Sequence, residues 1–358
     1  MPEKAETKSV CESEKSRFNN YDVLRIISTI AVIVIHVNWH FFGSRARTPM
    51  LDANFLVESI LNIVTRFSVP AFVMISGAFN LRKETNGNII IFYKKSIWKI
   101  FLPSALAIAL FFSYDITKAI VFKRNILSSV MEIVYGDYYN LWFIYMLAGL
   151  YLLTPFIVKL KENLNSNTYI IASFSLLLWA VISQAVSSQK VAYAIGVVFA
   201  FLGYYLAGDI ILNYIDLRHK SISYYAIAGI MFALAFIARF LGATYYLSAA
   251  YTNFFSPFIT VASLCIFAAV KQSRVQKDWS WLSGKTFYLY IFHTIVYSSI
   301  FKIFRFLGIA GLEPVQIIIV SGLTFFVSLM LSVFYDKFWS SRIKWKKKYD
   351  ALTIWEKA

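Results

Sequence analysis

The stretch LRIISTIAVIVIHVNWHFF, residues 24–42, decides what kind of fold this chain adopts. It is apolar over about 19 residues, which is the length that an α-helix needs to cross a hydrocarbon core of about 30 Å. The residues before it are polar and mixed in charge, and no small-residue cleavage site follows it. The stretch therefore predicts a retained transmembrane helix and not a signal peptide.

Similar apolar stretches recur along the whole chain. Hydrophobic residues make up 59% of the sequence and charged residues 15%, against about 45–50% and about 25% in soluble domains. Backbone groups in lipid must be paired within their own segment, so each stretch is expected to be a helix. We predict an all-α polytopic membrane protein with about ten transmembrane helices: Leu24–Phe42, Ile60–Ala78, Ile97–Ser113, Leu141–Val158, Tyr169–Val186, Val191–Leu212, Tyr224–Leu241, Asn253–Val270, Thr286–Phe304 and Val315–Tyr335.

The distribution of basic residues predicts the orientation. With the N-terminus in the cytoplasm, the cytoplasmic parts hold 23 Lys and Arg and the other side holds 7, which satisfies the positive-inside rule with both termini cytoplasmic. The plasma membrane is the expected location, and the net charge of +16 is assigned to lipid contact and not to nucleic acid. The basic run 344–348 resembles an interfacial anchor on anionic lipid.

The chain is expected to form a single membrane domain, residues 21–338, between a polar tail, 1–20, and a basic tail, 339–358. Cys11 lies in the polar tail and Cys265 lies in an apolar stretch, so they predict no disulfide. The dispersed His and Cys residues show no ligand spacing, so we expect no metal site and no bound cofactor.

Ionisable residues inside spans are costly, and they usually mark function. Arg25 and His36 are eleven residues apart in the first predicted helix. Eleven steps of about 100° bring both to the same helix face, about 16 Å apart along the axis. Arg66, in the antiparallel second helix, is expected at the depth of His36, and Ser76 at the depth of Arg25. The spacing thus predicts two polar levels along one pair of helices.

Structural roles are the alternative for these residues. Arg25 can pair with Asp22 at the start of its helix, and a histidine in an apolar helix is often only a hydrogen-bond partner. Ser76 and Gly77 are also small residues of the type that let helices pack closely.

Further candidates lie later in the chain. Arg66 can pair with Glu58 or Asp52, or extend to the interface. His293, about seven residues into its helix and nearer the cytoplasm than His36, is either a core histidine or part of the site. Arg239 either extends to the interface or binds an anionic substrate. Trp142, like His40, is typical of an interfacial aromatic belt.

Four sequence segments, in this order, resemble the acyltransferase 3 family of membrane acyltransferases. The first is Asp22-Val-Leu-Arg25 with His36 eleven residues beyond Arg25, and the second is RFSVPAFVMISG, residues 66–77. The third is LWFIYMLAGLYLLTP, residues 141–155, and the fourth is LYIFH, residues 289–293. They cover nearly the whole chain. The resemblance is greatest to stand-alone members, which O-acetylate surface polysaccharides or their lipid-linked precursors.

The chain departs from the family pattern at two places. The family often has an Arg-x-x-Arg pair before the third helix, where this sequence has Ser96 and Lys99. A lysine is a point charge without the bidentate fork of arginine. The family's Ser-Gly-Tyr is Ser76-Gly77-Ala78 here, which removes a phenol.

The resemblance implies an enzyme that moves an acyl group, with acetyl preferred, from cytoplasmic acyl-CoA to a hydroxyl of a surface glycan or lipid-linked sugar. Such a transfer needs a base and an oxyanion donor. We assign the first role to His36, as a base or a transient acyl carrier, because a histidine in apolar surroundings stays neutral and accepts a proton. We assign the second role to Arg66. Acyl-CoA contact is expected from Arg25, Ser76, Lys94, Lys95 and Lys99.

The acceptor is expected from outside, past the loop Tyr114–Asn140 with its Asp137, and its binding or support is assigned to His293, Arg239 and Trp142 as well. A transporter or flippase for a polysaccharide precursor is the competing function, since helices with midplane ionisable groups fit it too. A non-catalytic sensor or scaffold is a third. Dependence on acyl-CoA separates the enzyme from both.

Overall fold

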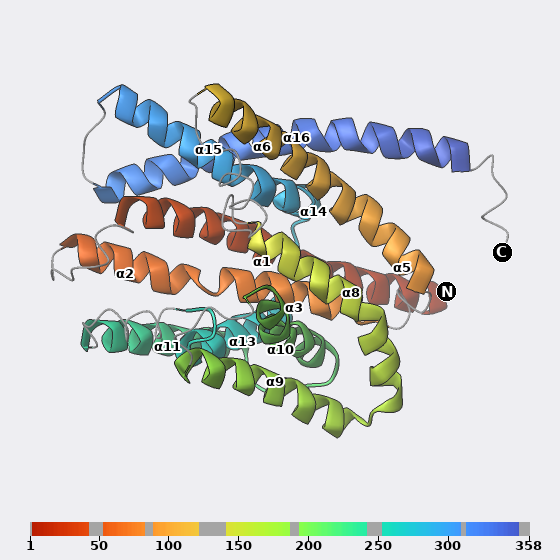
Figure 1. Cartoon of the computed structure of the whole chain (residues 1–358). Coiled ribbons are helices and arrows are strands. Elements are labelled where there is room, and N and C mark those ends of the chain that lie inside the picture. Colours follow the sequence, from red (N-terminus) through yellow and green to blue (C-terminus); the bar gives the residue numbers. More distant parts are fainter. Residues whose placement is uncertain are drawn as a thin grey trace.

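The computed structural model describes residues 2–42, 53–82, 89–121, 141–186, 193–241, 253–308 and 313–350. Within these ranges every regular element is helical (Figure 1), as predicted. The elements are α1 (Pro2–Phe42), α2 (Ala53–Thr65), α3 (Ser68–Asn80), α5 (Ile89–Ser96), the π-helix η2 (Ile97–Phe101), α6 (Leu102–Val121), α8 (Trp142–Asn163), α9 (Ser166–Val186), α10 (Tyr193–Asn213), α11 (Ser221–Leu241), α13 (Pro257–Gln272), α14 (Ser280–Ser283), α15 (Thr286–Phe306) and α16 (Glu313–Asp350).

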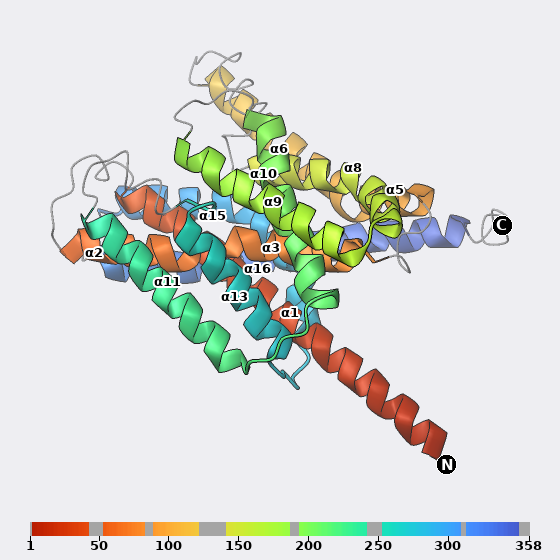
Figure 2. The same cartoon turned by 90° about the horizontal axis from the view of Figure 1, so that it is seen from below.

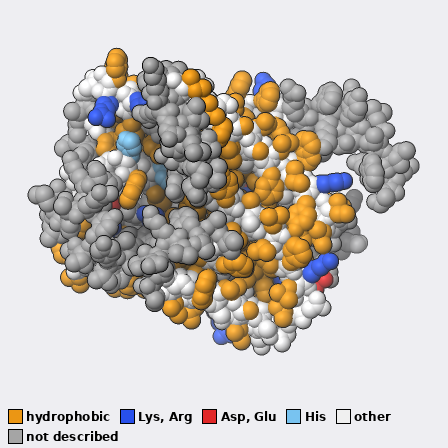
Figure 3. All heavy atoms as spheres, in the orientation of Figure 1, with side chains coloured by type: hydrophobic (Ala, Val, Ile, Leu, Met, Phe, Trp, Pro, Cys, Tyr) orange, Lys and Arg blue, Asp and Glu red, His pale blue; other side chains and the backbone are white. Residues whose placement is uncertain are grey.

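Eight of the ten predicted stretches correspond to helical spans of membrane-crossing length, and the other two correspond to shorter apolar helices. The described residues contain eight helical spans long and apolar enough to cross a membrane, with two shorter apolar helices, Leu102–Ser113 and Pro257–Gln272. Large apolar side chains lie exposed on the outer helices, such as Ile171, Ile230 and Met330, and hydrophobic side chains cover much of the face in Figure 3. Exposed apolar surface of this extent suits lipid, so the chain is a polytopic membrane protein.

The helices are arranged around α1 and the α2–α3 span, which lie between the pair α15–α16 and the pair α11–α13 (Figures 1 and 2). Residues 201–212 of α10 are all buried. A Cβ at Gly77 of α3 would overlap the Tyr205 carbonyl oxygen of α10, and one at Gly208 would overlap that of Met74. These glycines let two backbones touch, so the packing role considered for Gly77 is confirmed.

The second predicted helix, Ile60–Ala78, is interrupted in the structure. α2 ends at Thr65, two turn residues follow, and α3 begins at Ser68. Pro70 explains the break, because proline has no N–H to donate to the carbonyl of the residue four positions back, which is Arg66. The Arg66 N–H bonds to the Ile63 carbonyl, 3.3 Å away, in a tighter turn. The break therefore lies at a candidate site residue.

A π-helix connects α5 to α6, where the sequence predicted the start of a span. Here the Leu102 N–H bonds to the Ile97 carbonyl, five residues back. The next donor in this pattern would be residue 103, which is proline and has no N–H. The Trp98 carbonyl instead accepts a hydrogen bond from Trp339 Nε1 of α16, 3.2 Å away. The irregular segment thus ties α16 to the α5–α6 helix.

Both the start of α1 and the end of α16 lie at the same end of the bundle (Figure 1), which agrees with termini on one side. Residues 2–20, predicted as a polar tail, continue the helix of α1. This end, where α3 ends and α5 and α11 begin, is called the basic end below. It carries Arg82, Lys94, Lys95, Lys161, Arg218 and Lys220. Its cytoplasmic location stays a prediction.

A buried carboxylate joins four helices at the basic end. Asp209 of α10 is 0% exposed and accepts hydrogen bonds from Lys161 Nζ at 2.6 Å, the Tyr169 hydroxyl at 2.9 Å and Asn213 Nδ2 at 2.7 Å. Lys161 also donates to the Leu81 carbonyl, 3.2 Å away, directly after α3. A buried charge with this many partners is well satisfied, so the cluster fixes the end of α3 against α8, α9 and α10.

Candidate functional site

Two histidines meet inside the bundle. The rings of His36 on α1 and His293 on α15 have centroids 5.1 Å apart, and the Tyr297 ring lies parallel to His36 at 6.3 Å. The sequence placed His293 nearer to the cytoplasm than His36. The two rings are in fact neighbours. The predicted difference in depth came from counting residues from the predicted helix ends, which is accurate only for helices that run straight across the membrane.

Hydrogen bonding defines the tautomer of His293. This side chain is 0% exposed, and its Nδ1 contacts the Tyr290 carbonyl oxygen. A carbonyl only accepts, so Nδ1 carries the hydrogen and Nε2 carries the accepting lone pair in the neutral ring, where the Thr294 hydroxyl can donate to it. Nε2 lies 3.4 Å from the Thr294 hydroxyl. His293 therefore presents a proton acceptor inside the protein, beside His36.

Arg66 lies at the break between α2 and α3, within electrostatic range of His36. Its Nε donates to Asn62 Oδ1 at 2.7 Å, and its guanidinium lies over the Phe254 ring at 5.0 Å. Within the described residues no group accepts a hydrogen bond from its two terminal nitrogens. Arg66 thus keeps a pair of donors for a ligand, and the common depth of Arg66 and His36 stays a prediction.

Arg239 of α11 is buried and bonded to α2 through two of its nitrogens. It pairs with the Glu58 carboxylate of α2, and its Nε donates to Ser59 Oγ at 2.8 Å. Glu58 also accepts from Asn62 Nδ2 at 3.1 Å, the same amide whose oxygen holds Arg66. Arg239 therefore acts on the site through Glu58 and Asn62. The pairing of Glu58 considered for Arg66 goes instead to Arg239.

Trp142 begins α8 and belongs to an aromatic cluster. Its ring centroid is 6.0 Å from that of Phe254 and 5.9 Å from that of Phe201. Phe254 in turn lies against the Arg66 guanidinium. Trp142 thus supports the wall on which Arg66 rests.

A cavity of about 470 Å³ leads from the basic end toward the histidine pair. Arg25 and Ser76 both line it, as expected from their predicted common depth. Arg25 pairs with Asp22, 3.1 Å away, so the structural pairing considered for it is also present. Asp336 and Trp339 of α16 line it as well. This volume lies in the range of ligand sites in proteins, about 300–1,000 Å³.

Aromatic rings separate the cavity from the histidines. Phe72, Phe143 and Tyr290 line it, and the Tyr290 ring lies 4.8 Å from Phe143 and 5.3 Å from His293 between centroids. Tyr290 is buried and also holds His293 through its carbonyl. One ring therefore lies in contact with both the cavity and the histidine pair.

The remaining predicted residues lie away from the histidine pair or outside the described residues. Lys94 and Lys95 are exposed on α5 at the basic end. Lys99 is part of the π-helix, and its side chain is not described. Asp137 lies outside the described residues.

Asn62 and Tyr290 also belong to the site, and neither was predicted from the sequence. Glu58, Asn62 and Arg66 are spaced four residues apart and so share one helix face, a signal that was readable in the sequence. Nothing in the sequence distinguishes Tyr290 from its aromatic neighbours, because its position depends on packing between helices.

Comparison with known proteins identifies the family of the chain. A family model described as an acyltransferase domain, of the acyltransferase 3 type, matches residues 18–333. The chain belongs to the acyltransferase 3 family. Membership of this family favours an enzyme over the transporter and scaffold alternatives, and the matched range includes His36, Arg66 and His293.

One curated relative is a protein named amino-acid racemase from Enterococcus faecalis, 31% identical over 136 residues. That match covers 36% of this chain and 18% of the relative, so the chain corresponds to a minor part of that protein. No solved structure matches the chain.

Proposed function

We propose that this membrane acyltransferase uses acyl-CoA, with acetyl-CoA as the preferred donor. Its acceptor is a hydroxyl of a surface glycan or lipid-linked sugar precursor, and its location is the plasma membrane. The observation that carries the proposal is the cavity that runs from the basic end to Tyr290, one aromatic ring from the two histidines. This arrangement supplies a donor entrance and a proton acceptor within one bundle.

The donor enters from the basic end. Lys94 and Lys95 are exposed there and suit the phosphates of coenzyme A through charge-assisted hydrogen bonds. Arg25 and Ser76 on the cavity wall bind the polar parts of the pantetheine arm, and the surrounding rings hold its apolar parts. The thioester carbonyl then lies at the inner end, beside Tyr290.

His36 acts as the general base. It removes the proton from the acceptor hydroxyl as the oxygen attacks the thioester carbonyl carbon. The terminal nitrogens of Arg66 bind the oxygen that becomes negative in the tetrahedral intermediate. The carbon–sulfur bond then breaks, and the leaving thiolate takes the proton from His36, so that ester and free coenzyme A result. The Nε2 lone pair of His293 gives His36 a neighbour that can share its proton.

The test is turnover of radiolabelled acetyl-CoA by purified protein in detergent. We expect His36→Ala to bind label but lose release of acetate or transfer. His40→Ala is the matched control, because His40 lies four residues along on α1 and stacks on Phe301 at 3.9 Å. Normal turnover in folded His36→Ala would refute the role of His36. A folded wild type that binds no acetyl-CoA would refute the donor.

A further inference from the structure

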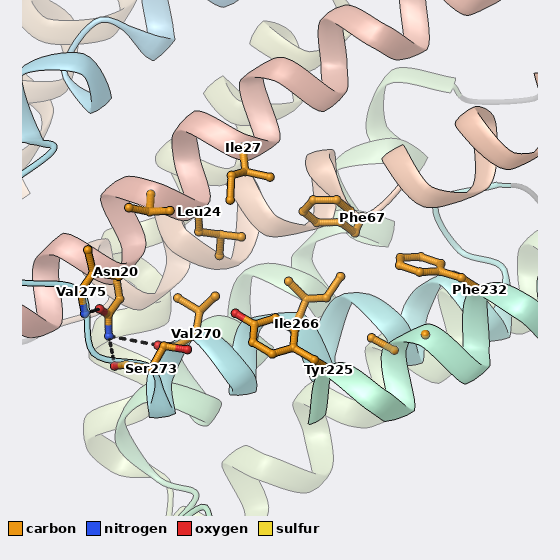
Figure 4. Close-up of a pocket in the computed structure, with 13 residues that line it drawn as sticks. Asn20, Leu24, Ile27, Phe67, Tyr225, Phe232, Ile266, Val270, Ser273 and Val275 are labelled. Carbon is orange, nitrogen blue, oxygen red and sulfur yellow. Dashed lines mark hydrogen bonds between the residues drawn. The ribbon is translucent and has the colours of Figure 1, made fainter. Parts of the chain in front are cut away.

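A second cavity lies between α1, α11 and α13 (Figure 4). It is separate from the cavity of about 470 Å³ lined by Arg25 and Ser76, which we call the donor cavity. The volume of the second cavity is about 360 Å³. Asn20 and Ser273 lie at one end of it, and Phe67 and Phe232 lie at the other. Its walls are almost wholly apolar, and they include Leu24, Ile27, Tyr225, Gly229, Ile266 and Val270. We call it the lateral groove.

The lateral groove opens toward lipid. Ile27 is 48% exposed and Tyr225 is 41% exposed, and Gly229 is exposed as well. All three lie within membrane-spanning lengths of α1 and α11. From Asn20 to Ile27 the helix rises about 10 Å, while one leaflet of the hydrocarbon core is about 15 Å deep. The groove therefore matches most of the depth of a lipid tail in the leaflet at the basic end.

Basic residues surround the mouth of the lateral groove. Arg274 lies between the lining residues Ser273 and Val275, and it is exposed. Lys277 follows, over the Trp279 ring at 4.6 Å. On the other side of the mouth, Lys220 directly precedes α11, with Arg218 beside it.

Two exposed aspartates, Asp216 and Asp278, lie in the same connecting segments, so these segments together carry four cations and two anions. Asn20 closes the wall beneath them, because its amide donates to the Val270 carbonyl at 3.1 Å and accepts from the Val275 N–H at 2.8 Å. The mouth is therefore a fixed structure with excess positive charge at the level of lipid headgroups.

We propose that the lateral groove binds one anionic phospholipid from the leaflet at the basic end. A tail lies along Leu24, Ile27 and Ile266, and the phosphate contacts Arg274 and Lys220. The apolar walls select a hydrocarbon chain, and the cations select a negative headgroup over a zwitterionic one. The proposal does not depend on the acyl-transfer reaction.

The chain offers a matched pair of variants for the test. A Cβ at Gly229 or at Gly322 would meet no atom within 4 Å, so either position has open space in which a larger side chain can begin. Gly229→Phe fills the lateral groove. Gly322→Phe places the same ring on α16, which does not line it. A third variant, Arg274→Gln with Lys220→Gln, removes two cations and leaves the apolar walls intact.

Delipidated protein in detergent is titrated with dioleoyl phosphatidylglycerol or dioleoyl phosphatidylcholine, and bound lipid is counted by native mass spectrometry. We expect wild type and Gly322→Phe to retain one phosphatidylglycerol and Gly229→Phe to lose it. The double Gln variant should bind phosphatidylglycerol about 25-fold more weakly, which is about fivefold per charge.

Three results would overturn the proposal. Equal binding by the two Phe variants would exclude the lateral groove as the site. Equal affinity of wild type for both lipids would exclude selection by the headgroup. A lipid-free dimer that Gly229→Phe disrupts would mean that a second copy of the chain fills the groove. Thermal unfolding of each variant in the same detergent identifies any loss of binding that is due to misfolding.

Discussion

Asn62 is predicted to act in catalysis only through Arg66. Its side-chain oxygen accepts a hydrogen bond from Arg66 Nε at 2.7 Å, and its amide donates to Glu58. Asn62→Leu keeps the approximate volume and removes both bonds. Arg66 then loses the contact that orients its terminal nitrogens, while its charge remains.

The expected size of the effect follows from that contact. A hydrogen bond to a charged group contributes about 1.5–3 kcal/mol, so its loss from the transition state lowers kcat/KM by about 10- to 100-fold. Arg66→Met removes the oxyanion donor itself and should lower kcat by a factor of about 10²–10³. Asn62 has no further role in catalysis, so the double variant should be no slower than Arg66→Met.

The assay is the rate of acetyl-CoA turnover by the four proteins of this cycle, with thermal unfolding measured on the same samples. Asn38→Leu is the control, because Asn38 Nδ2 donates to the Glu58 carbonyl at 3.2 Å and no bond between Asn38 and Arg66 is found within the described residues. Losses that multiply in the Asn62 and Arg66 double variant would refute the positioning role. An equal loss in the Asn38 variant would assign the effect to general damage around Glu58.

Three further outcomes follow from the packing. Tyr290→Ala should raise the turnover of octanoyl-CoA relative to acetyl-CoA by at least about tenfold, since each excluded methylene contributes about 1–3 kcal/mol; Tyr288→Ala, on the same cavity but away from His293, should not. Glu58→Gln leaves the buried charge of Arg239 without its partner and should cost about 3–5 kcal/mol in unfolding. Adding Arg239→Met should recover most of that stability, and a double variant as unstable as the single one would argue against the pair. Gly77→Ala should overpack the contact of α3 with α10, lower the free energy of unfolding by about 1–3 kcal/mol and so lower the thermal unfolding temperature. An unchanged temperature would contradict the close contact of these two helices.

Hydropathy predicted the helices well because lipid imposes one rule on every span. Each apolar stretch must be helical and long enough to cross, so Leu24–Phe42 and its counterparts are readable without tertiary information. The spacing of Arg25 and His36 was informative for the same reason, since a regular helix converts residue number into direction and depth. The donor cavity lined by Arg25 and Ser76 follows this geometry.

Features that depend on contacts between helices were not readable in advance. His293 and His36 are 257 positions apart, and only the packing of α15 on α1 makes them neighbours. The partnership of Lys161 with Asp209 has the same origin. The break at Arg66 is an intermediate case, because Pro70 was visible and its effect on the helix is general. The role of Asn62 as the partner of Arg66 was likewise accessible from a spacing of four residues.

The ring of Tyr290 also has a consequence for the ability of the membrane to hold back protons. An enzyme that admits a donor from one face and an acceptor from the other must not join the two entrances into a water-filled passage. Moving one charge through 100 mV releases about 2.3 kcal/mol, so even a narrow continuous path would conduct protons and discharge the cell. Phe72, Phe143 and Tyr290 line the donor cavity, and their rings contact one another, so we expect them to restrict such a path. On this reasoning, cells that express Tyr290→Ala should show raised proton permeability, apart from any change in the acyl groups that they transfer.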